Sequence, residues 1–166
     1  MARLVLVGLP GTGKTTVARD VARRWNCVAL DTDELVAATM GEPAGAYLRR
    51  VGEPDFRAAE LVALGEALEA DAVVSTGGGV VTTPAARALL SEQVTIWLDG
   101  SDEAVASRLD STDRPLLGHD PVASLRDLRH ARESLYREVA RARVDVEGSA
   151  QDVTQRVIDA AAKVGA

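Results

Sequence analysis

Short apolar runs alternate along the chain with longer segments in which apolar residues recur at helical spacing. The runs occupy residues 4–7, 28–30, 72–75, 94–98 and 144–146, and they lack the polar alternation of a strand with one wet face. Such strands are typical of a parallel sheet covered on both faces. The helical pattern predicts helices over residues 16–25, 33–40, 56–70, 84–90, 102–109, 121–143 and 150–164. The sequence therefore predicts an α/β fold of three layers, with a five-stranded parallel sheet between helices.

Length and composition narrow the class of protein. The 166 residues predict a single domain over residues 1–166, with ordinary globular values of 46% hydrophobic and 27% charged residues. The net charge of −6 argues against a nucleic-acid or membrane surface. Cys27 has no partner for an internal disulfide, and the sequence has neither a signal-peptide layout nor an apolar stretch of membrane-spanning length. We therefore expect a cytoplasmic protein, with a monomer as the default.

The strongest motif lies between the first strand and the first helix. Residues 8–15 read GLPGTGKT and fit the pattern G-x-x-x-x-G-K-[ST]. In that pattern backbone N–H groups and a helix N-terminus surround phosphate, the lysine reaches the outer phosphates and the hydroxyl binds Mg²⁺. A chance match at a plain turn is the alternative, and the strand and helix on either side argue against it. The motif predicts a nucleoside-triphosphate site of the P-loop NTPase type, with its phosphate ligands at Gly11, Thr12, Gly13, Lys14, Thr15 and Thr16.

Two carboxylates follow the second strand, where ligands of open parallel sheets bind. Asp31 and Asp33 stand two residues apart. One could serve hydrated Mg²⁺ and the other an acceptor hydroxyl. The alternative is that Asp33 only caps the next helix. Downstream of a phosphate loop we favour the catalytic interpretation.

Arg57 and a glycine run are the next features that could bind an acceptor. Glu60 lies one helical turn from Arg57 and could orient it as a clamp for a carboxylate or phosphate, although an exposed ion pair is the commoner meaning of this spacing. Residues 77–79 are three glycines that would let a ligand approach main-chain N–H groups, unless they only allow a tight crossing of the chain.

Arginines near the C-terminal half could complete the site. The segment 110–121 has the prolines, glycine and polar residues of a flap, and its Arg114 could stabilise charge on the moving phosphoryl group; a solvated loop arginine is the alternative. On the following helix, Arg132, Tyr136 and Arg137 occupy neighbouring turns. One of these two arginines could face the site while the other lies on the surface.

Taken together, these residues resemble the shikimate kinases, small P-loop kinases of the nucleoside-monophosphate-kinase-like group. The resemblance covers nearly the whole chain, and its set of motifs is specific although the first one alone is not. The motifs are GLPGTGKTT at 8–16, LDTDELV at 30–36, GEPDFRAAE at 52–60, STGGGVV at 75–81, RPLL at 114–117 and RESLYREVA at 132–140.

The resemblance implies Mg²⁺-dependent transfer of the ATP γ-phosphate to the 3-hydroxyl of shikimate, in the route to chorismate and aromatic amino acids. It implies a small substrate-binding insertion near residues 32–60 and a lid near 110–121. Asp31 would reach the metal through water, and Asp33 would hold ring hydroxyls as the candidate base. The remaining implied roles are shikimate binding by Phe56, Arg57, Gly77, Gly78, Gly79 and Arg132, and nucleotide binding by Arg108 and Arg114. Glu60 would support the pocket, and residues 147–151, after the last strand, would flank the adenine.

Three other functions fit part of this pattern. A gluconate kinase of the same build would not need Arg57 and Arg132 aimed at one carboxylate. A nucleoside monophosphate kinase would need a base-reading pocket that the sequence does not reveal. A nucleotide switch without catalysis would not need Lys14, Asp33 and Arg114 together. The combined residues favour the small-molecule kinase.

Overall fold

The computed structural model describes residues 1–109 and 119–165, and its centre is one parallel sheet. The strand order is β2-β3-β1-β4-β5, which confirms the predicted five-stranded parallel sheet. In the register, Val5 of β1 lies beside Val74 of β3 on one side and Thr95 of β4 on the other. The strands are β1 (Leu4–Val7), β2 (Val28–Asp31), β3 (Ala72–Ser75), β4 (Thr95–Asp99) and β5 (Ala142–Asp145).

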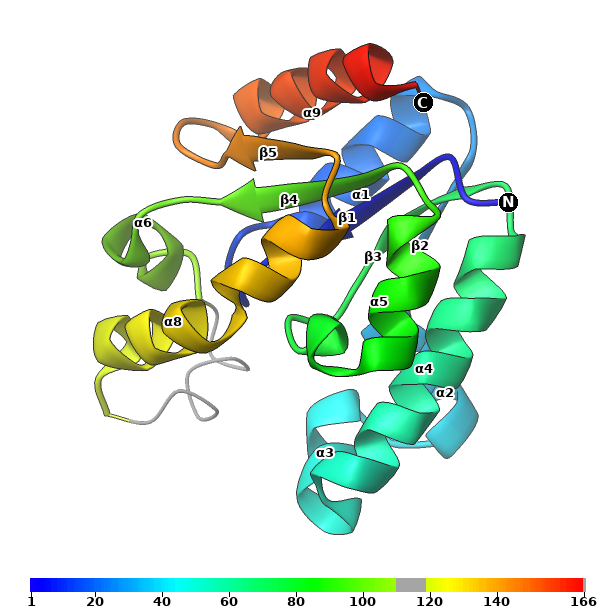
Figure 1. Ribbon diagram of the computed structural model, residues 1–166, viewed down its shortest axis with the longest axis vertical. Coiled ribbons are helices and arrows are strands. Elements are labelled where there is room, and N and C mark those ends of the chain that lie inside the picture. Colours follow the sequence, from blue (N-terminus) through cyan, green and yellow to red (C-terminus); the bar gives the residue numbers. More distant parts are fainter. Residues whose placement is uncertain (110–118, 166) are drawn as a thin grey trace.

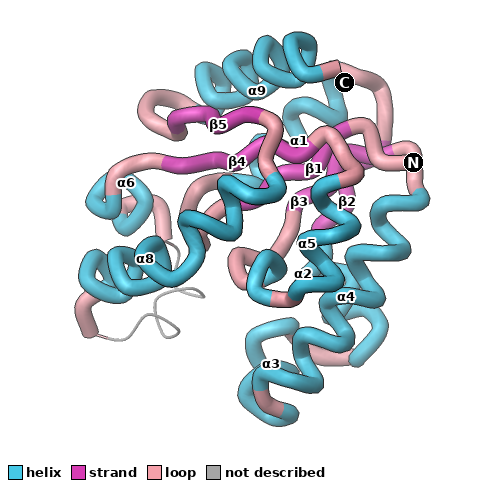
Figure 2. Tube along the Cα trace, viewed as in Figure 1, coloured by secondary structure: helices cyan, strands magenta, loops and turns pink. Residues whose placement is uncertain are grey.

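Helices cover both faces of the sheet and make the three layers visible in Figures 1 and 2. On one face lie α1 (Lys14–Arg24) and α9 (Ala150–Val164), which pack against each other. On the other lie α4 (Glu53–Glu69), α5 (Pro84–Ser91) and α8 (Pro121–Val139). The shorter elements are α2 (Thr32–Met40), α3 (Ala44–Val51), the 3₁₀ turn η1 (Val80–Thr82) and α6 (Asp102–Ala106).

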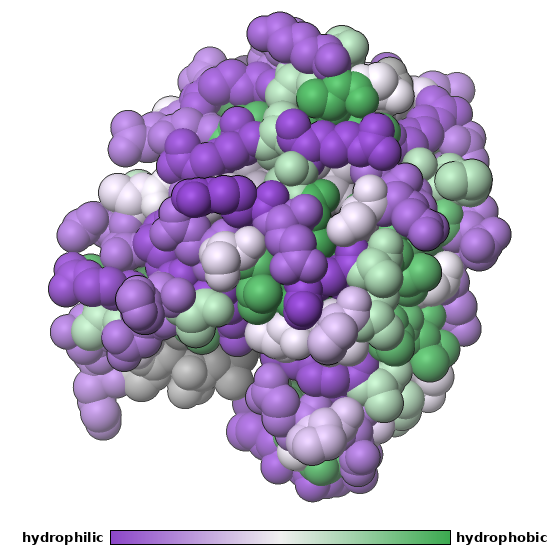
Figure 3. Space-filling view, in the orientation of Figure 1, coloured by the Kyte–Doolittle hydropathy of each residue, from purple (hydrophilic) through white to green (hydrophobic). Residues whose placement is uncertain are grey.

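The apolar runs form the core because both faces of the sheet are covered. All four residues of β1 are fully buried, and Val21 of α1 and Leu64 of α4 bury their side chains with them from opposite layers. Val36, Phe56 and Ala63 form a second, smaller cluster where α2 and α4 meet α3. The view in Figure 3 is largely hydrophilic, with apolar side chains gathered along α4. No helix among the described residues is long and apolar enough to cross a bilayer.

Several element boundaries differ from the sequence prediction. Helix α3 was not predicted from the sequence. None of its eight residues is fully buried, and its apolar side chains pack against α2 and α4. The predicted helix 121–143 was too long: α8 ends at Val139, Ala140 is extended, and β5 begins at Ala142. The predicted helix 102–109 is also shorter, since α6 ends at Ala106. Most of the expected lid, including Arg114, lies outside the described residues.

Candidate active site

The phosphate loop connects β1 to α1. Gly13 caps α1 with φ 84°, a left-handed conformation that favours glycine, and a Cβ on Gly8 would lie 2.3 Å from the carbonyl oxygen of Leu98. The ammonium group of Lys14 donates to the carbonyl oxygens of Gly8 and Leu9, both at 2.9 Å. The loop therefore has the strand–turn–helix context that the motif requires.

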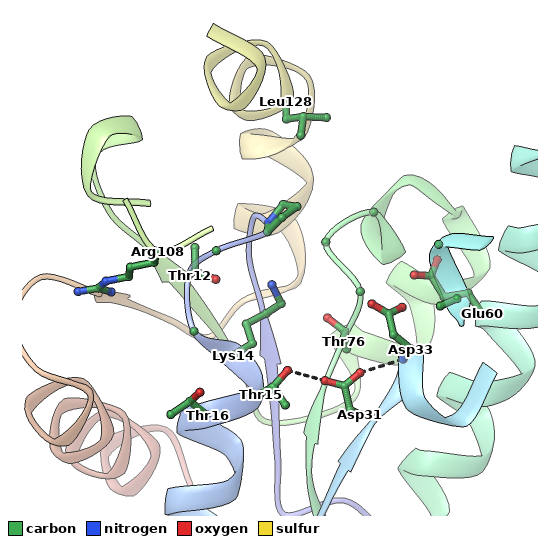
Figure 4. Close-up of a pocket in the computed structure, with 18 of the residues that line it drawn as sticks. Thr12, Lys14, Thr15, Thr16, Asp31, Asp33, Glu60, Thr76, Arg108 and Leu128 are labelled. Atoms are coloured by element: carbon green, nitrogen blue, oxygen red, sulfur yellow. Dashed lines mark hydrogen bonds between the residues drawn. The ribbon is translucent and has the colours of Figure 1, made fainter. Parts of the chain in front are cut away.

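Asp31 joins the phosphate loop to the start of α2. Its Oδ2 accepts a hydrogen bond of 2.6 Å from the Thr15 hydroxyl, and its Oδ1 accepts one of 2.9 Å from the backbone N–H of Asp33 (Figure 4). The Ser75 hydroxyl at the end of β3 lies 3.3 Å from that of Thr15. Asp31, not Asp33, is thus the N-cap of α2. The interpretation of Asp33 as a helix cap was wrong, and its carboxylate faces the pocket.

Asp33 has an unusual pKa because of its position in the hollow. Water reaches its side chain, but the surrounding protein replaces much of its hydration, and this loss raises the pKa from 3.8 to about 6. The charges of Asp31 and Glu60 raise the pKa further, while Lys14 and Arg57 oppose them. A carboxyl group with a pKa near neutrality is suited to accept a proton.

Arg57 is fixed by two carboxylates of α4. It donates from Nη1 to Glu60 at 2.7 Å, and from Nε and Nη2 to Glu53 at 3.0 and 2.8 Å. The side chains of Arg57 and Glu60 are 14% and 2% exposed, so the alternative of an exposed surface pair was wrong. The other oxygen of Glu60, Oε1, is buried without a hydrogen-bond partner among the described residues, and burial raises the pKa of this carboxyl group.

The glycine turn, residues 77–79, is pressed against three parts of the site. A Cβ on Gly77 would lie 2.5 Å from Glu60 Oε1 and 2.9 Å from Asp33 Oδ1. A Cβ on Gly78 would lie 2.8 Å from the ring of Pro10, and one on Gly79 would lie 2.1 Å from Nη2 of Arg57. The glycines therefore allow a tight crossing of the site's own side chains, and the approach of a ligand to their N–H groups stays a prediction.

Helix α8 brings Arg132 to the same pocket. Arg132 lines it and lowers the pKa of Glu60 through its charge, whereas Arg137 is exposed and pairs with Glu133. The helix is held to the sheet by Arg129, whose guanidinium bonds to Asp99 at the end of β4 and, at 2.8 Å, to Asp102. Of the two arginines near Tyr136, Arg132 faces the site.

One cavity of about 650 Å³ collects these groups. In Figure 4, Asp33 and Glu60 lie on one side of it, across from Lys14, and Arg108 lies at the far end. Arg108 donates to the carbonyl oxygen of Gly148 at 3.0 Å, so it meets the 147–151 segment. The predicted site residues that line the cavity are Gly11, Thr12, Gly13, Lys14, Thr15, Thr16, Asp31, Asp33, Phe56, Arg57, Gly77, Gly78, Gly79, Arg108 and Arg132.

Three contributors to the site were not recognised in the sequence. Glu53 could have been found, because it precedes Arg57 by one helical turn. Ser75 ends a strand beside the phosphate loop, and Pro10 occupies a variable position of the motif. Their contacts depend on the register of β1 with β3, which the sequence does not specify.

Comparison with known proteins agrees with this geometry. The family model "Shikimate kinase" matches residues 10–162. A shikimate kinase of Corynebacterium glutamicum is 42% identical over 139 residues, covering 82% of each chain. The solved structure of the Acinetobacter baumannii shikimate kinase in complex with shikimate superposes with a TM-score of 0.91 at 33% identity, covering 98% of this chain and 93% of that one.

The gluconate-kinase alternative shares the fold alone. A gluconokinase structure from Sinorhizobium meliloti has a TM-score of 0.66 and 20% identity. The family match and the similar proteins therefore agree on one assignment: the chain belongs to the shikimate kinase family, and it is an ATP-dependent kinase that phosphorylates shikimate.

Proposed function

We propose that this kinase holds the shikimate carboxylate between Arg57 and Arg132 and presents the 3-hydroxyl to Asp33. The observation that carries the proposal is that these two arginines, distant in sequence, line one cavity with Asp33 and Lys14. Two guanidinium groups suit a carboxylate because each can donate paired hydrogen bonds. Phe56 and the glycine turn form the wall beside them.

The chemistry then uses the two ends of the cavity. The 3-hydroxyl oxygen attacks the γ-phosphorus, the bond from that phosphorus to the β–γ bridging oxygen breaks, and ADP leaves. Asp33 takes the hydroxyl proton, which its raised pKa favours. Lys14 leaves its two carbonyl partners to stabilise the phosphates. We assign the same task to Arg114, following the family resemblance.

The residues beside the phosphate loop fit a magnesium ion. The Thr15 hydroxyl lies within hydrogen-bonding distance of oxygen atoms of both Asp31 and Ser75, and oxygen is the ligand that Mg²⁺ prefers. Among the described residues there is no cluster of three acidic, histidine or cysteine side chains that would hold a metal. We therefore propose that Thr15 and Asp31 hold Mg²⁺ that arrives with ATP, where it would neutralise phosphate charge.

We also propose that Arg108 and the segment after β5 enclose the adenine, supported by the hydrogen bond from Arg108 to Gly148. For the whole protein we propose a cytoplasmic monomer that binds no nucleic acid. The net charge of −6 supports this. The molar mass measured by light scattering, at the enzyme concentration used in activity assays, tests whether the protein is a monomer.

An ADP-release assay with shikimate and gluconate tests the acceptor site. We expect Arg57→Ala and Arg132→Ala to raise the KM for shikimate at least tenfold and to leave the KM for ATP within about twofold, because the carboxylate is remote from the transferred group. Arg137→Ala is the matched control on the same helix, since its side chain is 72% exposed. An unchanged KM for shikimate in Arg132→Ala would refute the clamp.

A further inference from the structure

Tyr136 is the largest fully buried side chain of the protein's described part and lies one helical turn beyond Arg132 on α8. Its ring stacks on Trp97 of β4, with 5.8 Å between ring centroids and an interplanar angle of 22°. Stacking and burial fix the ring, so the position of its hydroxyl group is determined by the core. The roles assigned above to the site residues do not use this side chain.

The hydroxyl group of Tyr136 donates a hydrogen bond to the carbonyl oxygen of Gly78 in the glycine turn. The positive charge of Arg132, one helical turn away on α8, also acts on this hydroxyl group. Burial raises the pKa of Tyr136 to about 12, although Arg132 and Arg57 lower it. The hydroxyl group therefore keeps its proton at physiological pH and remains a donor.

The hydrogen bond to Gly78 orients the middle of the glycine turn. The carbonyl groups on either side have local partners: Gly77 accepts from the N–H of Val80 at 3.2 Å, and Gly79 accepts from Thr82. Within the part of the chain that the structure describes, only the Gly78 carbonyl among these three is held by a distant element. In a trans peptide the C=O and the next N–H point in opposite directions, so Tyr136 directs the N–H of Gly79 away from α8.

This orientation matters because glycine lacks a side chain that could fix it. Gly78 rests on Pro10 of the phosphate loop, and Gly79 lies against the guanidinium of Arg57. A rotated peptide at this point would displace both contacts. One hydroxyl group therefore connects the turn that supports Arg57 with the helix that carries Arg132.

We propose that Tyr136 is a positioning residue for the acceptor site, whose hydroxyl group sets Arg132 and the glycine turn at the separation that the acceptor carboxylate requires. The inference rests on the clamp proposed above for Arg57 and Arg132. It assigns Tyr136 no contact with the substrate.

Tyr136→Phe tests the proposal because it removes the hydroxyl group and keeps the ring on Trp97. We expect the Kd for shikimate, measured by calorimetry, to rise roughly tenfold, which corresponds to one buried hydrogen bond and its unsatisfied partner. The KM for ATP should stay within about twofold. The matched control is Tyr47→Phe, which deletes the same atom from a tyrosine outside the cavity lining. Equal shikimate affinities in Tyr136→Phe and the wild type would overturn the proposal.

A double-mutant cycle separates positioning from simple stabilisation. If the hydroxyl group acts partly through Arg132, the double variant Tyr136→Phe/Arg132→Ala should lose less affinity for shikimate than the two single variants lose when their losses are added. Additive losses would overturn the connection. A merely structural role would lower the melting temperature without changing the Kd of the folded protein, and that result also counts against the proposal. If Arg132→Ala binds shikimate normally, the clamp itself fails; if only Tyr136→Phe does, the clamp stands.

Discussion

The raised pKa of Asp33 should make the kinase activity depend on pH, and the charge of Glu60 should help to set the pH at which activity falls. Asp33 must be ionised to accept the proton of the acceptor hydroxyl, and its pKa is raised from 3.8 to about 6, first by lost hydration and then by the charges of Asp31 and Glu60. Activity should therefore fall as the pH decreases through 6. Glu60→Gln removes one of the two raising charges, so the fall in activity should move to lower pH.

The size of the effect follows from the titration of one group. With a pKa of about 6, roughly one Asp33 in eleven is ionised at pH 5 and about ten in eleven at pH 7, so kcat/KM should drop about tenfold between these values. With the ordinary value of 3.8, more than about nine in ten would be ionised at pH 5 and the profile would be nearly flat.

The assay is kcat/KM for shikimate between pH 5 and 8 at saturating MgATP, with a carbon-13 titration of Asp33 in the ligand-free protein as a direct measure of its pKa. Glu53→Gln is the matched control, because Glu53 also bonds to Arg57 but is not among the groups that shift Asp33. A flat wild-type profile, or a midpoint that is the same in Glu60→Gln and the wild type, would refute this account of Asp33.

Two further predictions concern packing. Gly79→Ala places a Cβ 2.1 Å from Nη2 of Arg57, so the guanidinium must move and the Kd for shikimate should rise at least tenfold; Gly65→Ala on α4, where a Cβ meets nothing within 4 Å, should bind normally. Asp99→Asn removes the charge of a carboxylate that is 5% exposed and breaks its ion pair with Arg129. This variant should lower the free energy of unfolding by about 3 kcal/mol in urea titrations. Equal shikimate affinity in the two alanine variants, or an unchanged urea midpoint in Asp99→Asn, would contradict these expectations.

The sequence predicted the parts of the fold that depend on local pattern. The apolar runs of β1, β3 and β4 are buried on both faces, so their composition alone identified them. Helix α3 escaped prediction because it is stabilised by contacts with α2 and α4 rather than by its own residues.

Chemical types in the site were predictable, and so was the pairing of Glu60 with Arg57, but the contacts between different elements were not. Asp31 and Asp33 are both good N-caps, so only the backbone geometry could show that Asp31 takes this place. The glycine turn was recognised as a point of close approach, but its neighbours depend on how α4, α8 and the phosphate loop meet above the sheet. Arg57 and Arg132 converge because α4 and α8 cover the same face.

The two carbonyl partners of Lys14 bear on how quickly ATP can bind. The ammonium group of Lys14 bonds to the start of the phosphate loop and holds the two ends of this loop together. The conformational entropy of the loop is therefore lost during folding rather than when ATP binds. Capture of the nucleotide then requires one side chain to exchange oxygen acceptors, a motion of nanoseconds. Diffusion, and not loop rearrangement, should limit the association rate at this end of the cavity.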